Sequence, residues 1–179
     1  MPEGIEVLSL KDTGFEAEIE ENGRTLEENS LIKAQAVYAW LEANGRTGVD
    51  GVFADDTGLE INALNGAPGV FTARWAGEPA ANRKKALREL EGKDDRSCRF
   101  RTVITLIRRK DPDYIQVEGI VRGRIAEEEY GEGGFGYDPL FVPEGYDKTF
   151  GELPAELKNT ISHRARALEK LVEVLKEKA

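Results

Sequence analysis

VFADDTGLEINALNGAPG, residues 52–69, joins an apolar run, two adjacent acids, an alternating segment and a glycine-rich turn. Residues 52–54 predict a short buried strand that runs into Asp55 and Asp56. Residues 59–63 alternate apolar and polar side chains and predict a second strand, which the NGAPG turn ends. We therefore expect the two acids at the point where the first strand ends.

Two uses fit a pair of acids at a strand end. If the chain turns outward at Thr57-Gly58, the carboxylates can bind a divalent cation or accept a proton. A solvated turn has the same composition. The pair by itself leaves both interpretations open.

A helix is expected from about Leu26 to Ala43. Thr25 and Glu28 form a capping-box pattern at its start. Asn29 and Lys33, which are four residues apart, share one face of this helix. Apolar side chains at spacings of three and four predict the buried face, which consists of Leu31, Ala34, Tyr38 and Leu41.

The remaining periodicities interleave strands with helices, which predicts an α/β (α+β mixed) class and a single domain over residues 1–179. The other expected elements are strands at 5–8, 99–109 and 139–142, one or two strands within 114–126, and a turn at DPD (111–113). A helix is expected to begin at Pro79 and end near Gly92, and a last helix has an apolar stripe of Ala167, Leu168, Leu171, Val172 and Leu175.

The charge balance limits the possible partners. The formal net charge is −9, with 34 acids and 25 bases, which argues against extensive binding of nucleic acid. Residues 1–60 hold 14 of the acids and 4 of the bases, while bases gather from Arg83 to Lys110. An acidic lobe that attracts metal and a basic lobe that attracts phosphate would give this pattern, and so would solvated surfaces.

The compartment follows from cysteine use and hydropathy. Cys98 is the only cysteine, so no intramolecular disulfide can form, and we expect it packed in a strand. No segment is long and apolar enough to span a membrane, and the start lacks a signal-peptide pattern. We expect a cytoplasmic protein with no membrane partner.

Two further segments carry groups suited to ligand binding. In GGFGYDP, the glycines allow a close approach of the backbone to a ligand, and Phe135 or Tyr137 could stack on a base; a hairpin that packs both rings into the core fits equally. KNTISHRARAL places Lys158, His163 and Arg164 where a helix begins, and a helix N-terminus suits phosphate or a keto oxygen.

Three motifs in this order resemble the inosine triphosphate pyrophosphatase family: ADDTGLEINALNGAPGVFTARWAG (54–77), GGFGYDPLFVPEGYDKTFGEL (133–153) and KNTISHRARAL (158–168). The resemblance extends from about residue 4 to 176. It implies a mixed twisted sheet flanked by helices, with two lobes and a central cleft. It also implies a homodimer that hydrolyses ITP, dITP and XTP to the nucleoside monophosphate and pyrophosphate.

The resemblance also implies roles for single residues. Asp56 matches the general base and a metal ligand, and Glu21 and Asp55 match further acids that would hold Mg²⁺. The metal would offset the charge of the triphosphate while Asp56 takes a proton from water. The residues that would contact substrate are Asn29, Lys33 and Thr57, the base-binding loop Phe135, Gly136, Tyr137 and Asp138, and the purine-holding residues Lys158, His163 and Arg164.

Base choice would follow from hydrogen-bond types. Hypoxanthine and xanthine present an acceptor oxygen at the 6-position, where adenine presents a donor, so donors from His163 or Arg164 would leave adenine badly paired. Guanine shares this oxygen. Its exclusion must sense the 2-amino group, and the sequence assigns no residue to that task.

The family's T-G-N-x-x-K phosphate loop has no counterpart in this sequence. Two explanations fit. Either the natural protein begins upstream with this loop, which the start at Met1-Pro2 favours, or a shortened protein binds nucleotide, or serves as a dimerisation module, without turning nucleotide over. Asp56 would have little to act on in the second case.

Overall fold

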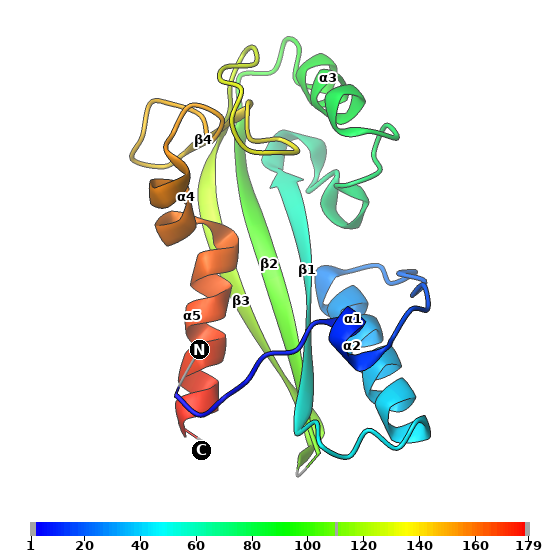
Figure 1. Ribbon diagram of the computed structural model, residues 1–179. Coiled ribbons are helices and arrows are strands. Elements are labelled where there is room, and N and C mark those ends of the chain that lie inside the picture. The colour runs from blue at the N-terminus through cyan, green and yellow to red at the C-terminus, as the bar shows by residue number, and fades with distance from the viewer. Residues whose placement is uncertain (1–2, 110, 178–179) are drawn as a thin grey trace. The chain divides into compact units, whose positions relative to one another are not determined.

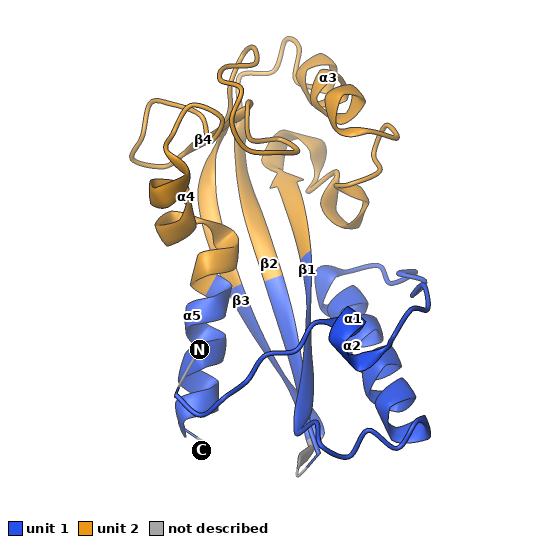
Figure 2. Ribbon diagram, viewed as in Figure 1, with its two compact units in different colours: residues 1–56, 103–118, 167–179 blue, residues 57–102, 119–166 orange. Residues whose placement is uncertain are grey.

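The computed structural model describes residues 3–109 and 111–177. Two features named from the sequence fall outside these ranges: the start of the chain at Met1-Pro2, and Lys110 at the end of the basic stretch. Two compact units make up the chain (Figure 2). The first unit comprises Met1–Asp56, Val103–Glu118 and Ala167–Ala179, and the second comprises Thr57–Thr102 and Gly119–Arg166.

A four-stranded sheet has the order β1-β2-β3-β4, with the strands in chain order (Figure 1). The strands are β1 (Gly51–Ile61), β2 (Ser97–Arg108), β3 (Asp111–Ile125) and β4 (Phe141–Pro143). The start of β1 lies beside the end of β2, because Arg109 N–H donates to Asp50 O at 3.0 Å. The start of β2 lies beside the end of β3, because Ile125 N–H donates to Arg96 O at 2.9 Å. β3 and β4 are also antiparallel.

The α/β class with helices beside a sheet is therefore confirmed, but the sheet is antiparallel across its four described strands and is not mixed. The β2–β3 connection is too short for the crossover that a parallel pair needs. The helices are α1 (Leu10–Thr13), α2 (Leu26–Ala43), α3 (Pro79–Glu89), α4 (Ala155–Ile161) and α5 (His163–Glu177), with 3-10 turns η1 (Asn62–Leu64) and η2 (Gly69–Phe71).

β1 is one continuous strand, so the expectation that Asp55 and Asp56 follow a strand end is wrong. Both acids lie in the middle of β1, in the part of the sheet where β2 runs alongside. A strand that is hydrogen-bonded to a neighbouring strand can continue through polar residues, even where the sequence pattern predicts that it ends. The side chains of such acids project from a rigid strand instead of from a turn.

The first unit has helices on both faces of its part of the sheet. α2 begins at its predicted cap, because Thr25 Oγ1 accepts from Glu28 N–H, although the Glu28 carboxylate returns to Arg24 N–H instead of to Thr25. One face of the sheet packs on α2 through Val52 and Ile107, and the other packs on α5. Residues 103–107 of β2 are accordingly buried at every position, as expected for a strand covered on both sides.

The buried faces of the two long helices differ in part from the predicted ones. In α2 the fully buried side chains are Leu26, Asn29, Ser30, Ala34, Val37 and Leu41, so Ala34 and Leu41 are confirmed while Leu31 and Tyr38 are only half-buried. In α5, Ala167 and Leu171 are buried against β2, but Leu168 is exposed. Two polar residues, Asn29 and Ser30, occupy the buried face of α2 near its start.

The second unit has its own core. It joins the second half of β1 to the first half of β2, α3 and the loops around β4, and its largest buried side chains include Leu59, Leu90, Phe100, Phe141 and Phe150. Cys98 is buried here, as expected, and burial raises the pKa of its thiol to about 12. A residue with this pKa is a packing residue rather than a nucleophile.

Two other local expectations fail. Residues 5–8 do not form a strand, and Ile5, Val7 and Leu8 are exposed, because no described strand pairs with this segment. β3 already begins at Asp111, so the turn predicted at residues 111–113 is wrong. Within residues 3–109 and 111–177, no helix has the length and apolar character to span a membrane.

Candidate active site

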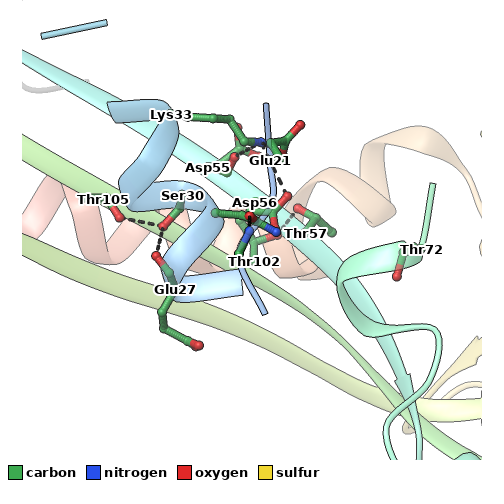
Figure 3. Close-up of polar contacts among 12 residues, drawn as sticks. Glu21, Glu27, Ser30, Lys33, Asp55, Asp56, Thr57, Thr72, Thr102 and Thr105 are labelled. Carbon is green, nitrogen blue, oxygen red and sulfur yellow. Dashed lines mark hydrogen bonds and ion pairs between the residues drawn. The ribbon is translucent and has the colours of Figure 1, made fainter. Parts of the chain in front are cut away.

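A lysine and two acids form the centre of a polar cluster in the first unit (Figure 3). Lys33, in the second turn of α2, places Nζ 2.8 Å from Glu21 Oε1 and 3.4 Å from Asp56 Oδ1. The same Nζ donates to the Asp55 backbone oxygen at 2.7 Å. Burial by itself would lower the pKa of Lys33, but the hydrogen bond to Glu21 and the charges of Asp56, Glu21 and Asp55 raise it. The ammonium is therefore charged at neutral pH.

Asp56 is the most desolvated acid of this cluster. Its side chain is 14% exposed, and burial raises the pKa of its carboxyl group, opposed by the charge of Lys33, reinforced by the charge of Glu21 and opposed again by hydrogen bonds from Lys33 and Asn29. Its Oδ2 is buried and has no hydrogen-bond partner. A raised pKa and an unpaired oxygen suit an acid that accepts a proton or binds a cation when substrate is present.

Asn29 supports this cluster from the first turn of α2. It is 2% exposed, and its Oδ1 accepts from Gly23 N–H at 2.8 Å, which fixes the chain just after Glu21. A Cβ at Gly23 would lie 2.7 Å from that same Oδ1, so the close approach requires glycine. Asn29 thus serves to position Glu21 as well as to contact Asp56.

Asp55 and Thr57 differ from Asp56 in their surroundings. Because side chains of a strand alternate, both project from the face opposite to that of Asp56. Asp55 has an exposed side chain. Thr57 Oγ1 lies 2.8 Å from Thr102 Oγ1 and shares a hydrogen bond with it. The role of Asp55 as a metal ligand and that of Thr57 as a substrate contact stay predictions.

Phe135 and Tyr137, which the sequence left equivalent as rings that could stack on a base, have different surroundings in the structure. Phe135 is 68% exposed, whereas Tyr137 is 4% exposed and belongs to the core of the second unit. The Tyr137 hydroxyl donates to Thr72 O at 2.7 Å, and burial raises the pKa of this phenol. Only Phe135 therefore offers a face on which a base could stack, while Tyr137 anchors the loop.

Asp138 holds the backbone of this loop. Its buried carboxylate accepts from Phe135 N–H at 2.9 Å and contacts Lys158 Nζ. Gly134 has φ +73°, and a Cβ there would lie 2.1 Å from Asp138 Oδ2. Gly136 has φ +61°, but its Cβ would meet open space. The loop therefore depends on glycine at 134 for both conformation and space, and at 136 for conformation alone.

The start of α5 places His163, the next of the predicted site residues. Ser162 is extended and its Oγ accepts from Ala165 N–H, so it caps the helix at whose first position His163 lies. His163 is buried, and its ring stacks on Phe100 with centroids 4.9 Å apart. Burial lowers the pKa of His163 to about 3, assisted by the charges of Arg164 and Lys158. His163 is therefore neutral at pH 7, with its Nδ1 buried and without a hydrogen-bond partner.

Two cations lie over the exposed ring of Phe135. Lys158 Nζ lies 4.5 Å and Arg164 Cζ 5.9 Å from its centroid. Arg164 is exposed. The second unit thus brings together four residues that the sequence placed near the purine, namely Phe135, Asp138, Lys158 and Arg164, beside His163.

Two residues of α3 that the sequence analysis did not single out as site residues support the second unit's group. Arg83, on α3, donates to Gly136 O at 2.9 Å and pairs with Glu129, which ties the base-binding loop to α3. Asn82 holds the segment after Thr72 by bonds to Ala76 N–H and Ala73 O. The sequence signal for Asn82 was its spacing of four residues from Ala86, with which it shares the buried face of α3.

Glu21 and Asp56 are the acids of the first unit that lie closest to Lys33 Nζ and could bind a divalent cation. Among the described residues, no three acids, histidines or cysteines are grouped to hold a metal ion. Mg²⁺ usually takes one or two carboxylates and completes its shell with water and substrate phosphates. Glu21 and Asp56 meet that need, since both converge on the Lys33 ammonium and Asp56 Oδ2 has no partner.

Comparisons with known proteins agree with the sequence motifs. The family model described as the Ham1 family matches residues 1–174. A dITP/XTP pyrophosphatase of Flavobacterium johnsoniae is 47% identical over 98% of this chain and 88% of its own length. One of Bacillus subtilis is 47% identical over 97% of this chain and 86% of its own length.

Solved structures give the same result. The Staphylococcus aureus Ham1 protein is 38% identical with a TM-score of 0.88, over 97% of this chain and 88% of that chain. A Ham1 protein from Coxiella burnetii is 43% identical with a TM-score of 0.80, over 90% of this chain and 81% of that chain. A family match over almost the whole sequence, with relatives and folds at these identities, shows that this chain belongs to the Ham1 family.

Proposed function

We propose that this chain hydrolyses the deaminated purine nucleoside triphosphates ITP, dITP and XTP to the monophosphate and pyrophosphate. The observation that carries the proposal is Asp56, a largely buried acid with a raised pKa and an unpaired buried oxygen beside a charged lysine. The names of relatives 47% identical to this chain, dITP/XTP pyrophosphatases, support the same reaction.

The first unit would handle the phosphates. Asp56 accepts a proton from the water that attacks the α-phosphorus, because its raised pKa makes it a stronger base than an ordinary aspartate. Lys33, held charged by its acids, neutralises charge that develops on the phosphate oxygens. Glu21 and Asp56 would hold a Mg²⁺ ion, with Asp55 as a further candidate, and the ion would supply charge neutralisation of the triphosphate.

The second unit would handle the base. A purine stacks on the exposed ring of Phe135, and Arg164 donates to its 6-oxygen. A neutral His163 can donate one N–H as well. Adenine, which presents a donor at this position, would leave these donors unpaired at a cost of roughly 1–3 kcal/mol. Lys158 is engaged by Asp138, so its main contribution is to order the loop.

A substrate panel tests the reaction. Pyrophosphate release is measured with ITP, dITP, XTP, ATP and GTP in the presence and absence of Mg²⁺. We expect release from the first three and dependence on the metal; equal rates on ATP would contradict the base selectivity. Binding of ITP by calorimetry without turnover would instead support a nucleotide-binding protein that lacks catalysis.

The variant Asp56→Asn tests the assigned base. Removal of a general base should lower kcat for ITP at least about 100-fold. Glu169→Gln removes an exposed carboxylate from α5 and should leave kcat unchanged. A loss of less than tenfold in Asp56→Asn would refute the role of Asp56.

The proposal includes a cellular location and an oligomeric state. A cytoplasmic location is consistent with the single buried Cys98, which cannot form an intramolecular disulfide. A homodimer is proposed from the family resemblance, and sedimentation of the purified chain tests it.

A further inference from the structure

A hydrogen-bonded network lies beneath the phosphate-handling residues, in the most apolar part of β2 (Figure 3). Thr105 is fully buried between buried apolar neighbours, with Ile104 and Leu106 on either side. Its Oγ1 lies 2.6 Å from Ser30 Oγ on α2 and 2.9 Å from Gln116 Nε2 on β3. Ser30 is also fully buried. A valine at 105 would fill this place without any need for partners.

Gln116 is the donor in two of the bonds of this network. Gln116 can only donate through Nε2, and it donates to both Thr105 Oγ1 and the Glu27 backbone oxygen, each at 2.9 Å. Thr105 Oγ1 and Ser30 Oγ share one hydrogen bond, and Ser30 Oγ lies 3.2 Å from Glu27 O as a second partner. Two side chains of the sheet therefore hold one carbonyl and one hydroxyl of the first turn of α2.

This network fixes the rotation of α2 about its own axis in the turns that carry Asn29 and Lys33. Asn29 precedes Ser30 in the chain, and Lys33 lies three residues after it on an adjacent part of the helix surface. Apolar contacts such as those of Val37 and Leu41 hold the helix against the sheet but allow small rotations, whereas hydrogen bonds are directional. The position of Lys33 Nζ relative to Asp56 and Glu21 depends on that rotation.

We propose that Thr105, with Gln116 and Ser30, is a positioning residue for the reaction: it sets the orientation of α2 and thereby places Asn29 and Lys33 against Asp56. This inference rests on the proposed function. It predicts an effect on the chemical step in particular, because the base-binding residues belong to other elements and keep their contacts. Misplacement of a catalytic group by about 1 Å can cost on the order of 100-fold in rate.

The test compares Thr105→Val with Thr105→Ser and with Val37→Ala. Thr105→Val keeps the β-branched shape and removes the hydroxyl, Thr105→Ser keeps the hydroxyl, and Val37→Ala weakens the packing of the same helix away from the cluster. With ITP, Thr105→Val should lose roughly tenfold or more in kcat with KM changed by less than about twofold. Thr105→Ser should keep most of kcat, and Val37→Ala should lower Tm without that loss.

Amide hydrogen exchange gives a second readout that does not depend on turnover. We expect faster exchange at residues 28–30 in Thr105→Val than in Thr105→Ser or Val37→Ala. Retention of wild-type kcat by Thr105→Val, or a loss no greater than that of Val37→Ala at an equal change in Tm, would overturn the inference. If the wild-type chain releases no pyrophosphate from ITP, the proposed function fails, and unchanged exchange at residues 28–30 would separately overturn the positioning role.

Discussion

The imidazole of His163 stacks on the ring of Phe100, with centroids 4.9 Å apart and planes 18° from parallel. The stack buries one face of this ring, which belongs to the only histidine in the chain. Burial and the neighbouring charges of Arg164 and Lys158 disfavour its protonation. A histidine in this position contributes a flat surface and a neutral hydrogen-bonding edge. It is not poised to exchange protons near neutral pH.

Acid should therefore destabilise the protein through His163. The pKa is lowered from 6.5 to about 3 on folding, so the unfolded chain binds a proton first as the pH falls through this window. The contribution of His163 to stability is present above pH 6.5 and is lost progressively towards pH 3, by at most about 5 kcal/mol. Urea unfolding at pH 7, 5.5 and 4 of wild type and His163→Gln measures it. The variant should lose less stability over this range, and parallel profiles would contradict the burial of a neutral ring.

The charge on Asp56 should cost stability. Its pKa is raised on folding, so the native state binds the proton more tightly than the unfolded chain, and stability falls as the pH rises from the ordinary value of 3.8 through the raised one. Above this window the cost stays constant. We expect Asp56→Asn to have a higher Tm than wild type at pH 7 and a similar Tm near pH 3. Calorimetric scans without nucleotide or metal check this, and a lower Tm at pH 7 would count against it.

Changes at Phe135 should affect the binding of ITP, whereas changes at Tyr137 should affect the stability of the fold. Phe135→Ala removes an exposed ring, so we expect an increased KM for ITP and an unchanged Tm. Tyr137→Phe removes the hydroxyl that donates to Thr72 O and should lower stability by about 1 kcal/mol while KM changes little. Steady-state kinetics and urea unfolding of both variants form the comparison. The opposite assignment of effects would mean that Tyr137 is the ring in contact with the base.

Gly134 and Gly136 provide a matched pair in the base-binding loop. Both have positive φ, so alanine at either position incurs backbone strain of about 1 kcal/mol. Only at Gly134 would the new Cβ also collide with Asp138 Oδ2, the atom that accepts from Phe135 N–H. Gly134→Ala should therefore raise KM for ITP more than Gly136→Ala. Equal effects would show that backbone conformation alone matters in this loop.

Local signals in the sequence predicted α2, α3 and α5, whereas the short helices α1 and α4 were not expected. Thr25 caps α2, Pro79 starts α3, and Ser162 caps the helix that begins at His163, because each of these effects involves residues within one turn of chain. Strand limits were harder. The Asp55-Asp56 pair looks like an interruption in a periodic pattern, and only the presence of β2 alongside keeps β1 continuous through it.

By itself, the sequence determined the family and the residue types at the site, since three long motifs carry both. Only the tertiary structure determined which of these residues are in contact, which are buried and which are exposed. Folding brings Glu21, Lys33 and Asp56 together from separate elements, withdraws Asp56 from water, and buries Tyr137 while leaving Phe135 exposed. These differences arise from desolvation and long-range packing, which depend on neighbours that lie far away in the chain and that no local pattern encodes.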